Sequence, residues 1–171
     1  MKRILIINLR RIGDVISTGH LIGSLLEGEQ QSKTEIHLLV YKENIAAAEC
    51  LSGVAKIHTI DRKELITLAN HNFMPGHLAL DKLYLTMIPI AHIAWDKIVN
   101  YSNDHVSTYI TSYLMEHPSQ VHGTYFKENR QPANQGLWEM FFNHIITEIL
   151  TSPLHFVDCY HRMLGVEVNK K

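Results

Sequence analysis

Short hydrophobic runs alternate with longer amphipathic segments along the first sixty residues. Residues 3–9, RILIINL, form a near-continuous Ile/Leu run, which is typical of a strand that is buried on both faces of a sheet. Residues 15–27 then place their aliphatic side chains on roughly one helical stripe. The alternation continues with a strand at 35–41, a helix at 44–53 that ends at a glycine, and a short strand at 55–61. This order predicts parallel strands joined by right-handed crossovers.

The second half of the chain continues the same pattern. Residues 62–94 predict two helices separated by a break at 74–76. Further elements are expected in the order strand 96–102, helix 104–116 with Asp104 as its N-cap, strand 120–126, polar stretch 127–136, helix 137–150 and helix 154–165. With no repeat or linker in the sequence, we expect one domain over residues 1–171. Its predicted fold is α/β, a Rossmann-like doubly wound parallel sheet in three α/β/α layers.

Composition narrows the class of protein without identifying it. The chain has 171 residues, of which 46% are hydrophobic and 19% charged, and its formal net charge is -1. This composition fits an ordinary globular protein, and the chain has no excess of positive charge that would favour binding to nucleic acid. The two cysteines, Cys50 and Cys159, lack metal-binding or disulfide-framework spacing. The start of the chain lacks the pattern of a signal peptide, so we expect a cytoplasmic protein.

The loop after the first strand, LRRIGD at 9–14, carries the densest group of candidate functional residues. Ligand sites of parallel sheets lie at the carboxyl ends of the strands, so this loop faces the expected site. Gly13 fits a turn that needs unusual backbone angles or a close approach, and Asp14 stands at the start of the next helix. Asp14 is either an N-cap or a functional carboxylate, and Arg10 and Arg11 either belong to a solvated turn or face an anion.

Several segments resemble the family 9 glycosyltransferases, which include the lipopolysaccharide heptosyltransferases of bacteria. The opening RILIINLRRIGDVISTGHLIGSLL is similar to that family's first strand, IGD turn and aliphatic helix. The segments at 34–61 and 95–114, and LHFVDCYHRMLGVE near the carboxyl end, are also similar to it. The pattern differs at Gly19 and His20, where the family commonly has a threonine–proline pair, and the strand end at 99–105 lacks the family's common glycine.

The resemblance implies a GT-B enzyme, in which two Rossmann-like domains face a cleft. This chain is then the amino-terminal, acceptor-binding half, and the carboxy-terminal domain that binds a nucleotide-sugar such as ADP-heptose is expected outside it, in a further domain or a partner chain. The acceptor is expected to be a carbohydrate or glycolipid of the lipopolysaccharide type. The family assigns the aspartate of the IGD turn as general base for inverting sugar transfer, and its match here is Asp14.

The remaining site residues are expected at the same edge of the sheet. Arg10 or Arg11, beside Gly13, is predicted to bind an acceptor phosphate or carboxylate, or to neutralise the leaving diphosphate. Asn100, Ser102 and Asn103 offer hydrogen bonds at the end of the fourth strand. No metal is expected, because the histidines lack ligand spacing such as HExxH. No resident cofactor is expected either.

Two expectations concern partners. The apolar stretch at 85–95 predicts either core packing or peripheral contact with the inner face of the membrane, and exposure of Met87, Ile90 and Trp95 would favour the membrane. The same choice applies to LWEMFF at 137–142. The alternative to an enzyme is a non-catalytic Rossmann-like binding or interaction module that lacks the donor domain.

Overall fold

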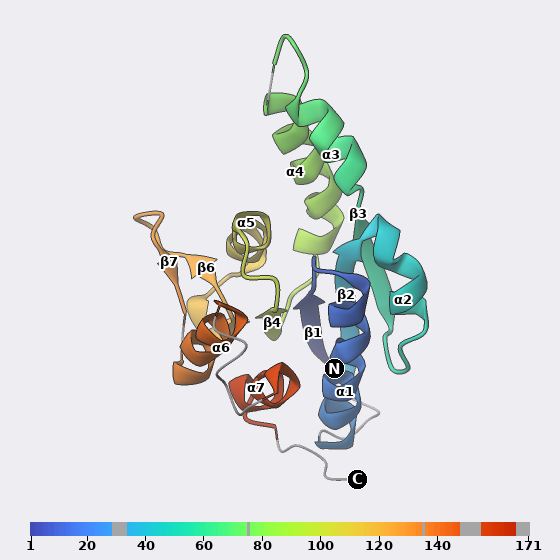
Figure 1. Ribbon diagram of the computed structural model, residues 1–171, viewed down its shortest axis with the longest axis vertical. Coiled ribbons are helices and arrows are strands. Elements are labelled where there is room, and N and C mark those ends of the chain that lie inside the picture. The colour runs from blue at the N-terminus through green and yellow to red at the C-terminus, as the bar shows by residue number, and fades with distance from the viewer. Residues whose placement is uncertain (29–33, 75, 135, 148–154, 167–171) are drawn as a thin grey trace.

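A computed structural model describes residues 1–28, 34–74, 76–134, 136–147 and 155–166. Within these ranges a five-stranded parallel sheet has the order β3-β2-β1-β4-β5 (Figure 1). Its strands are β1 (Lys2–Ile7), β2 (Thr34–Tyr41), β3 (Lys56–Ile60), β4 (Lys97–Asn100) and β5 (Val121–His122). Ile4 of β1 pairs with Ile36 on one side and with Lys97 on the other. The order therefore reverses between β1 and β4, and the predicted doubly wound α/β class is confirmed.

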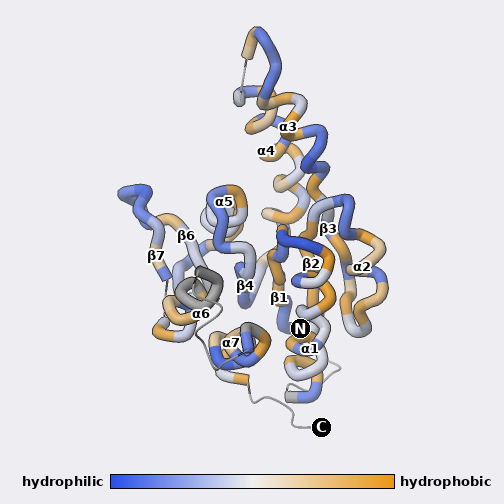
Figure 2. Tube along the Cα trace, viewed as in Figure 1, coloured by the Kyte–Doolittle hydropathy of each residue, from blue (hydrophilic) through white to orange (hydrophobic). Residues whose placement is uncertain are grey.

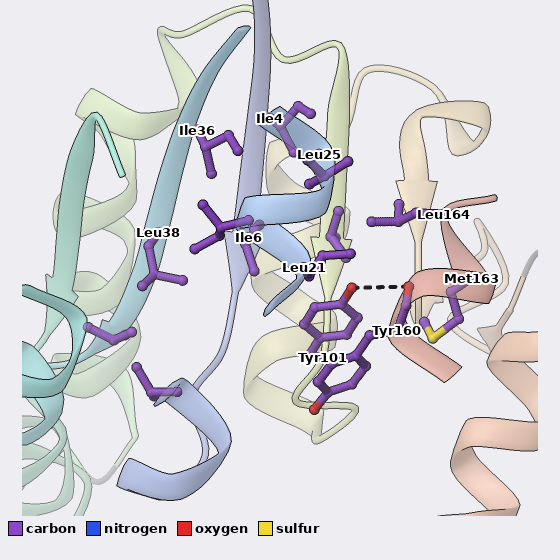
Figure 3. Close-up of a cluster of buried hydrophobic side chains, with 14 of the residues drawn as sticks. Ile4, Ile6, Leu21, Leu25, Ile36, Leu38, Tyr101, Tyr160, Met163 and Leu164 are labelled. Carbon is purple, nitrogen blue, oxygen red and sulfur yellow. Dashed lines mark hydrogen bonds between the residues drawn. The ribbon is translucent and has the colours of Figure 1, made fainter. Parts of the chain in front are cut away.

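Helices cover both faces of the sheet, as the uninterrupted apolar strands require. Ile4 and Ile6 of β1 point into one hydrophobic cluster, whereas Leu5 and Ile7 point into the other. The first cluster lies under α1 (Ile12–Gly28), α2 (Ile45–Glu49), α6 (Leu137–Thr147) and α7 (Phe156–Met163). The second lies under α3 (Arg62–Ala69), α4 (His77–Ala91) and α5 (His105–Leu114). Each fully buried aliphatic side chain contributes about 1.5–3 kcal/mol, and Figure 3 shows part of the first cluster.

Several boundaries differ from those predicted. The helix expected at 44–53 is divided into a 3₁₀ turn, η2 (Lys42–Asn44), and the short α2. A second 3₁₀ turn, η3 (Pro118–Gln120), precedes β5. The two helices around residues 74–76 and the Asp104 cap are confirmed: Asp104 accepts a hydrogen bond from the Ser107 N–H at 2.7 Å. Residues 148–150, the end of the helix predicted at 137–150, and 154, the start of the last predicted helix, lie outside the described residues.

The predicted fifth strand at 120–126 is wrong in extent. Only Val121–His122 joins the sheet, because the chain turns at Gly123, which has a φ of 113°. A Cβ atom there would lie 2.2 Å from the Asn100 carbonyl oxygen, so a residue with a side chain does not fit. After this turn β6 (Tyr125–Phe126) pairs antiparallel with β7 (Pro132–Ala133). The polar stretch thus forms a hairpin with a hydrophilic tip (Figure 2).

The stretch at 85–95 is not the exposed membrane-facing surface that one expectation required. Met87, Ile90 and Trp95 are 2%, 2% and 4% exposed: the first two lie on α4, Trp95 follows that helix, and all three belong to the second hydrophobic cluster. The segment 137–142 is mixed, with Leu137 exposed and Phe142 buried. Within the described ranges, no helix is both long enough and apolar enough to span a bilayer.

Candidate functional site at the carboxyl edge of the sheet

The loop between β1 and α1 is fixed by a fully buried asparagine that the sequence did not single out. The Asn8 side-chain amide donates hydrogen bonds to the Asp14 carbonyl oxygen and to the Thr18 hydroxyl, both at 3.0 Å. Its backbone N–H donates to the Leu39 carbonyl oxygen at 2.9 Å. Asn8 therefore holds the loop to both the first turn of α1 and the neighbouring strand β2.

Asp14 lies in the first turn of α1 and not in a loop before it, because the helix begins at Ile12. Its carboxylate is half-buried and accepts a hydrogen bond from the Arg11 backbone N–H at 3.3 Å. Asp14 is therefore not the N-cap that one interpretation expected: as the third helical residue it accepts a hydrogen bond from the backbone N–H that precedes the helix, near the positive helix end. The other interpretation, a functional carboxylate, stays a prediction.

The reason given for Gly13 is corrected by the structure. Gly13 is helical, its φ is not positive, and a Cβ atom added to it would have no neighbour within 4 Å. The backbone therefore does not require glycine at this position. What the absent side chain does provide is open space beside Asp14.

The two arginines have different surroundings. Arg10 is half-buried, and its Nη2 and Nε donate to the Ser102 carbonyl oxygen at 2.9 and 3.2 Å. Its own carbonyl oxygen accepts from the Asn44 side chain at 2.7 Å. Arg11 is exposed. Because both side-chain bonds of Arg10 end on a carbonyl, its charge has no carboxylate partner among the described residues, which suits it to bind an anion.

The end of β4 is held by side chains whose hydrogen bonds stay within the fold. Asn100 is fully buried; its Oδ1 accepts from the N–H groups of Ser102 and Asn103, and its Nδ2 donates to the Thr124 carbonyl oxygen at 3.0 Å. The buried Ser102 hydroxyl accepts from the Leu9 N–H at 2.6 Å. We therefore interpret Asn100 and Ser102 as residues that position the loops.

Asn103 differs from Asn100 and Ser102 because it is not fully buried. It is half-buried and has a φ of 52°, a left-handed conformation that asparagine tolerates better than most residues. Its Oδ1 lies 2.8 Å from the Thr124 hydroxyl, which lies at the same distance from Asn134 Oδ1 after β7. Thr124 and Asn134 were not predicted, because no local pattern shows that the hairpin returns to the site.

Two buried, stacked tyrosines lie near the charged residues of the site. The rings of Tyr101, after β4, and Tyr160, on α7, are stacked with centroids 3.7 Å apart, and the Tyr101 hydroxyl donates to the Tyr160 carbonyl oxygen (Figure 3). Burial raises the pKa of the Tyr160 hydroxyl, and the Asp14 carboxylate raises it further while Arg10 lowers it. Tyr160 is therefore a neutral neighbour of both charged groups. Nothing near it in the sequence indicated this role.

The site thus combines a half-buried carboxylate, a guanidinium held on a carbonyl and several neutral amides and hydroxyls. A carboxylate accepts a proton or a hydrogen bond from a hydroxyl, and a guanidinium binds phosphate or carboxylate. Neutral amides recognise hydroxyl groups. Within the described ranges, no three His, Cys, Asp or Glu side chains gather as metal ligands.

Comparisons with solved structures match this fold along nearly the whole chain. A glycosyl transferase of family 9 from Veillonella parvula matches with a TM-score of 0.65 at 17% sequence identity, over 99% of this chain and 42% of the other. The E. coli heptosyltransferase WaaC with ADP-2-deoxy-2-fluoro heptose matches with a TM-score of 0.64 at 14% identity, over 99% of this chain and 50% of the other. The same enzyme with ADP matches with a TM-score of 0.65 at 12% identity, over 99% of this chain and 49% of the other.

These matches establish the fold that the chain shares with known proteins. No protein-family model and no curated protein matches the sequence. The chain spans about half the length of the solved chains it matches. The predicted resemblance to family 9 is confirmed at the level of the fold: the chain has the Rossmann-like α/β architecture of these GT-B glycosyltransferase structures.

Proposed function

We propose that residues 1–171 form the acceptor-binding domain of an inverting glycosyltransferase similar to the heptosyltransferases. The observation that carries this proposal is that Asp14 and Arg10, four residues apart, both lie at the carboxyl end of β1 in a fold shared with glycosyltransferases. The guanidinium of Arg10, which has no carboxylate partner in the described ranges, lies in the loop after β1, and the half-buried carboxylate of Asp14 lies in the first turn of α1, next to the point where the strand order reverses. This is where ligands of open α/β sheets bind.

In the proposed reaction the acceptor hydroxyl lies against the Asp14 carboxylate. As the hydroxyl oxygen attacks the anomeric carbon of the donor, its proton passes to the carboxylate and the bond between that carbon and the diphosphate breaks. The electron pair of the broken bond leaves with the nucleoside diphosphate. The donor is a nucleotide-sugar such as ADP-heptose, bound by a second domain or a partner chain.

In this proposal Arg10 binds and positions an anionic group. Its guanidinium is fixed on the Ser102 carbonyl, so little side-chain freedom is lost when it binds an anionic group of the acceptor, or the leaving diphosphate. Asn103 would bind a sugar hydroxyl, and Gly13 would leave space for the sugar ring beside Asp14. The expected acceptor is a carbohydrate or glycolipid of the lipopolysaccharide type.

The test measures transfer of heptose from ADP-heptose to deacylated lipopolysaccharide core by mass spectrometry, with the donor-binding half supplied in the same polypeptide or as a separate domain. Asp14→Asn keeps the size and capping ability of the side chain but cannot accept the proton. We expect at least a 100-fold loss of transfer with unchanged acceptor binding. A matched control is Glu49→Gln at the end of α2, which should transfer at the wild-type rate.

One observation favours the alternative, a non-catalytic binding module. The Asp14 carboxylate already serves its own helix through the Arg11 N–H, and such a role needs no reaction. The module predicts that acceptor binding survives Asp14→Asn and that no transfer occurs even in the wild-type protein supplied with the donor-binding half. Acceptor binding without transfer would therefore favour the module, whereas full transfer by Asp14→Asn would contradict the role of Asp14 as general base.

A further inference from the structure

Exposed aromatic rings gather on one side of α5. Tyr84 on α4 and Tyr109 and Tyr113 on α5 are 54%, 60% and 43% exposed. With His105 at the start of α5 and the half-buried Phe126 of β6, they form what we call the tyrosine surface. The helix does not need these rings for its core, which it makes with Ile110 and Leu114 on an adjacent face.

The rings form two contacting groups that adjoin on α5. Tyr84 meets Tyr113 edge to face with centroids 5.6 Å apart, and Tyr109 meets Phe126 at 4.8 Å. His105 is stacked near Phe126 at 6.3 Å, and Tyr109 and Tyr113 are neighbours one helical turn apart. In Figure 1, α5 lies between α4 and the β6–β7 hairpin, so three separate elements supply this row. It is therefore a continuous patch and not a set of scattered exposed residues.

The tyrosine surface is continuous with the candidate site. His105 comes two residues after Asn103, and Phe126 two residues after Thr124, whose hydroxyl contacts Asn103. The Phe126 N–H donates to the Ser112 hydroxyl at 2.7 Å, which holds the hairpin on α5. A ligand bound at Asn103 that extends beyond the edge of the sheet would pass directly onto these rings.

The chemistry of the patch favours sugar rings as its occupant. A tyrosine offers a flat apolar face with a hydroxyl at its rim. A pyranose offers the complementary surfaces, an apolar face of C–H groups and a rim of hydroxyls. An anionic lipid surface would instead call for a cluster of lysine or arginine. α5 has neither, Lys82 on α4 pairs with Glu64, and Lys127 follows Phe126.

We propose that the tyrosine surface binds the sugar residues of the acceptor that lie behind the one held at Asp14. This inference rests on the proposed function, because the acceptor must be a saccharide. It assigns the site two parts: the Arg10–Asp14 loop holds the reacting end, and the tyrosine surface selects acceptors of more than one or two sugars.

The experiment compares two probes by isothermal titration calorimetry, a deacylated lipopolysaccharide core oligosaccharide and the disaccharide from its reacting end. Wild-type protein should bind the oligosaccharide at least tenfold more tightly. In Tyr109→Ala/Tyr113→Ala this preference should disappear while the disaccharide binds as before. Tyr109→Phe/Tyr113→Phe keeps the rings and should retain most of the preference. Phe73→Ala, which removes a ring that is 89% exposed in the turn between α3 and α4, is the matched control and should change nothing.

The results separate the two proposals. A preference that survives Tyr109→Ala/Tyr113→Ala, in protein that unfolds at the wild-type temperature, overturns the tyrosine surface. Dependence of self-association, or of binding to phosphatidylglycerol vesicles, on these tyrosines also overturns it. Oligosaccharide binding that needs the tyrosines but is unchanged in Arg10→Ala supports the tyrosine surface and contradicts the proposed role of Arg10. Failure of the wild-type protein to bind either probe overturns both proposals.

Discussion

The amide network around Asn8 and Asn100 and the histidine pair of β2 and β3 both bury polar side chains in an aliphatic sheet, but only the histidines can change their charge. His37 Nδ1 lies 2.9 Å from His58 Nε2, and His37 Nε2 lies 3.2 Å from Glu35 Oε1. The edge of Trp95 packs on the buried His37 ring at 5.0 Å. Neutral amides carry no charge at any ordinary pH, whereas protonation of His58 would place a positive charge on a half-buried ring.

The neutral amides and the histidine pair lie in parts of the sheet with different charges nearby. The amide network supports the carboxyl edge, where Asp14 and Arg10 already supply the charges, so neutral partners fix the loops without altering those charges. The histidine pair lies away from that loop, among Trp95, Lys56 and the Arg3–Glu35 ion pair. The comparison teaches that a folded edge can be kept independent of pH while another part of the same sheet responds to it.

Removing a central amide should have the largest effect. Asn100→Ala deletes the acceptor for two backbone N–H groups and the donor to the Thr124 carbonyl, all in a fully buried place. We expect a loss of about 3 kcal/mol in the free energy of unfolding, measured by urea denaturation. Asn129→Ala, in the exposed tip of the β6–β7 hairpin, is the control, with an expected loss below about 1 kcal/mol. An equal loss in both variants would show that the network does not hold the edge.

The histidine pair predicts a dependence of stability on pH. Burial, then His37 and Lys56, lower the pKa of His58 from 6.5 to about 4. The unfolded chain therefore binds a proton between these values that the folded chain does not, so stability is full above about pH 6.5 and is lost as pH falls towards 4. Because His58 is only half-buried, we expect a loss of about 1–2 kcal/mol from this group.

The measurement is thermal and urea unfolding between pH 4 and 7.5 for wild type and His58→Gln. His58→Gln should reduce the change in unfolding free energy between about pH 4 and 6.5. The control His20→Gln, at an exposed residue, should leave the dependence on pH unchanged. The neighbouring Glu35 has a pKa lowered chiefly by His37, so its contribution is also lost on acidification, but at lower pH. A profile of His58→Gln parallel to that of wild type would show that the pair does not titrate as described.

The smallest effect is expected at Gly13. Because Gly13 is helical and has open space before it, Gly13→Ala should raise the free energy of unfolding by about 0.5–1 kcal/mol. The same methyl group would enter the space proposed for the sugar beside Asp14. We therefore expect a more stable protein with weaker acceptor binding, measured by calorimetry. A less stable variant would contradict the helical position of Gly13.

Much of the fold could be predicted because its signals are local. The aliphatic runs of β1 and β2 indicated buried parallel strands, and Asp104 before an amphipathic segment indicated a helix start. The extent of β5 could not be predicted, because the turn at Gly123 depends on its distance from the Asn100 carbonyl, which lies on another strand. The site was predicted in part: the Arg10–Asp14 loop is at the expected edge, and its acceptor chemistry stays a prediction.

By itself the sequence determined the first four strands, most of the helices, the parallel pairing and the edge at which Arg10 and Asp14 lie, since periodicity and chain order are carried by neighbouring residues. Only the tertiary structure decided that Arg10 and not Arg11 is held across the edge, that Asn100 and Ser102 support loops, and that Tyr160 from α7 lies beside Asp14. It also decided that Met87, Ile90 and Trp95 face the core. These features depend on contacts between segments far apart in the chain, and such contacts leave no local pattern.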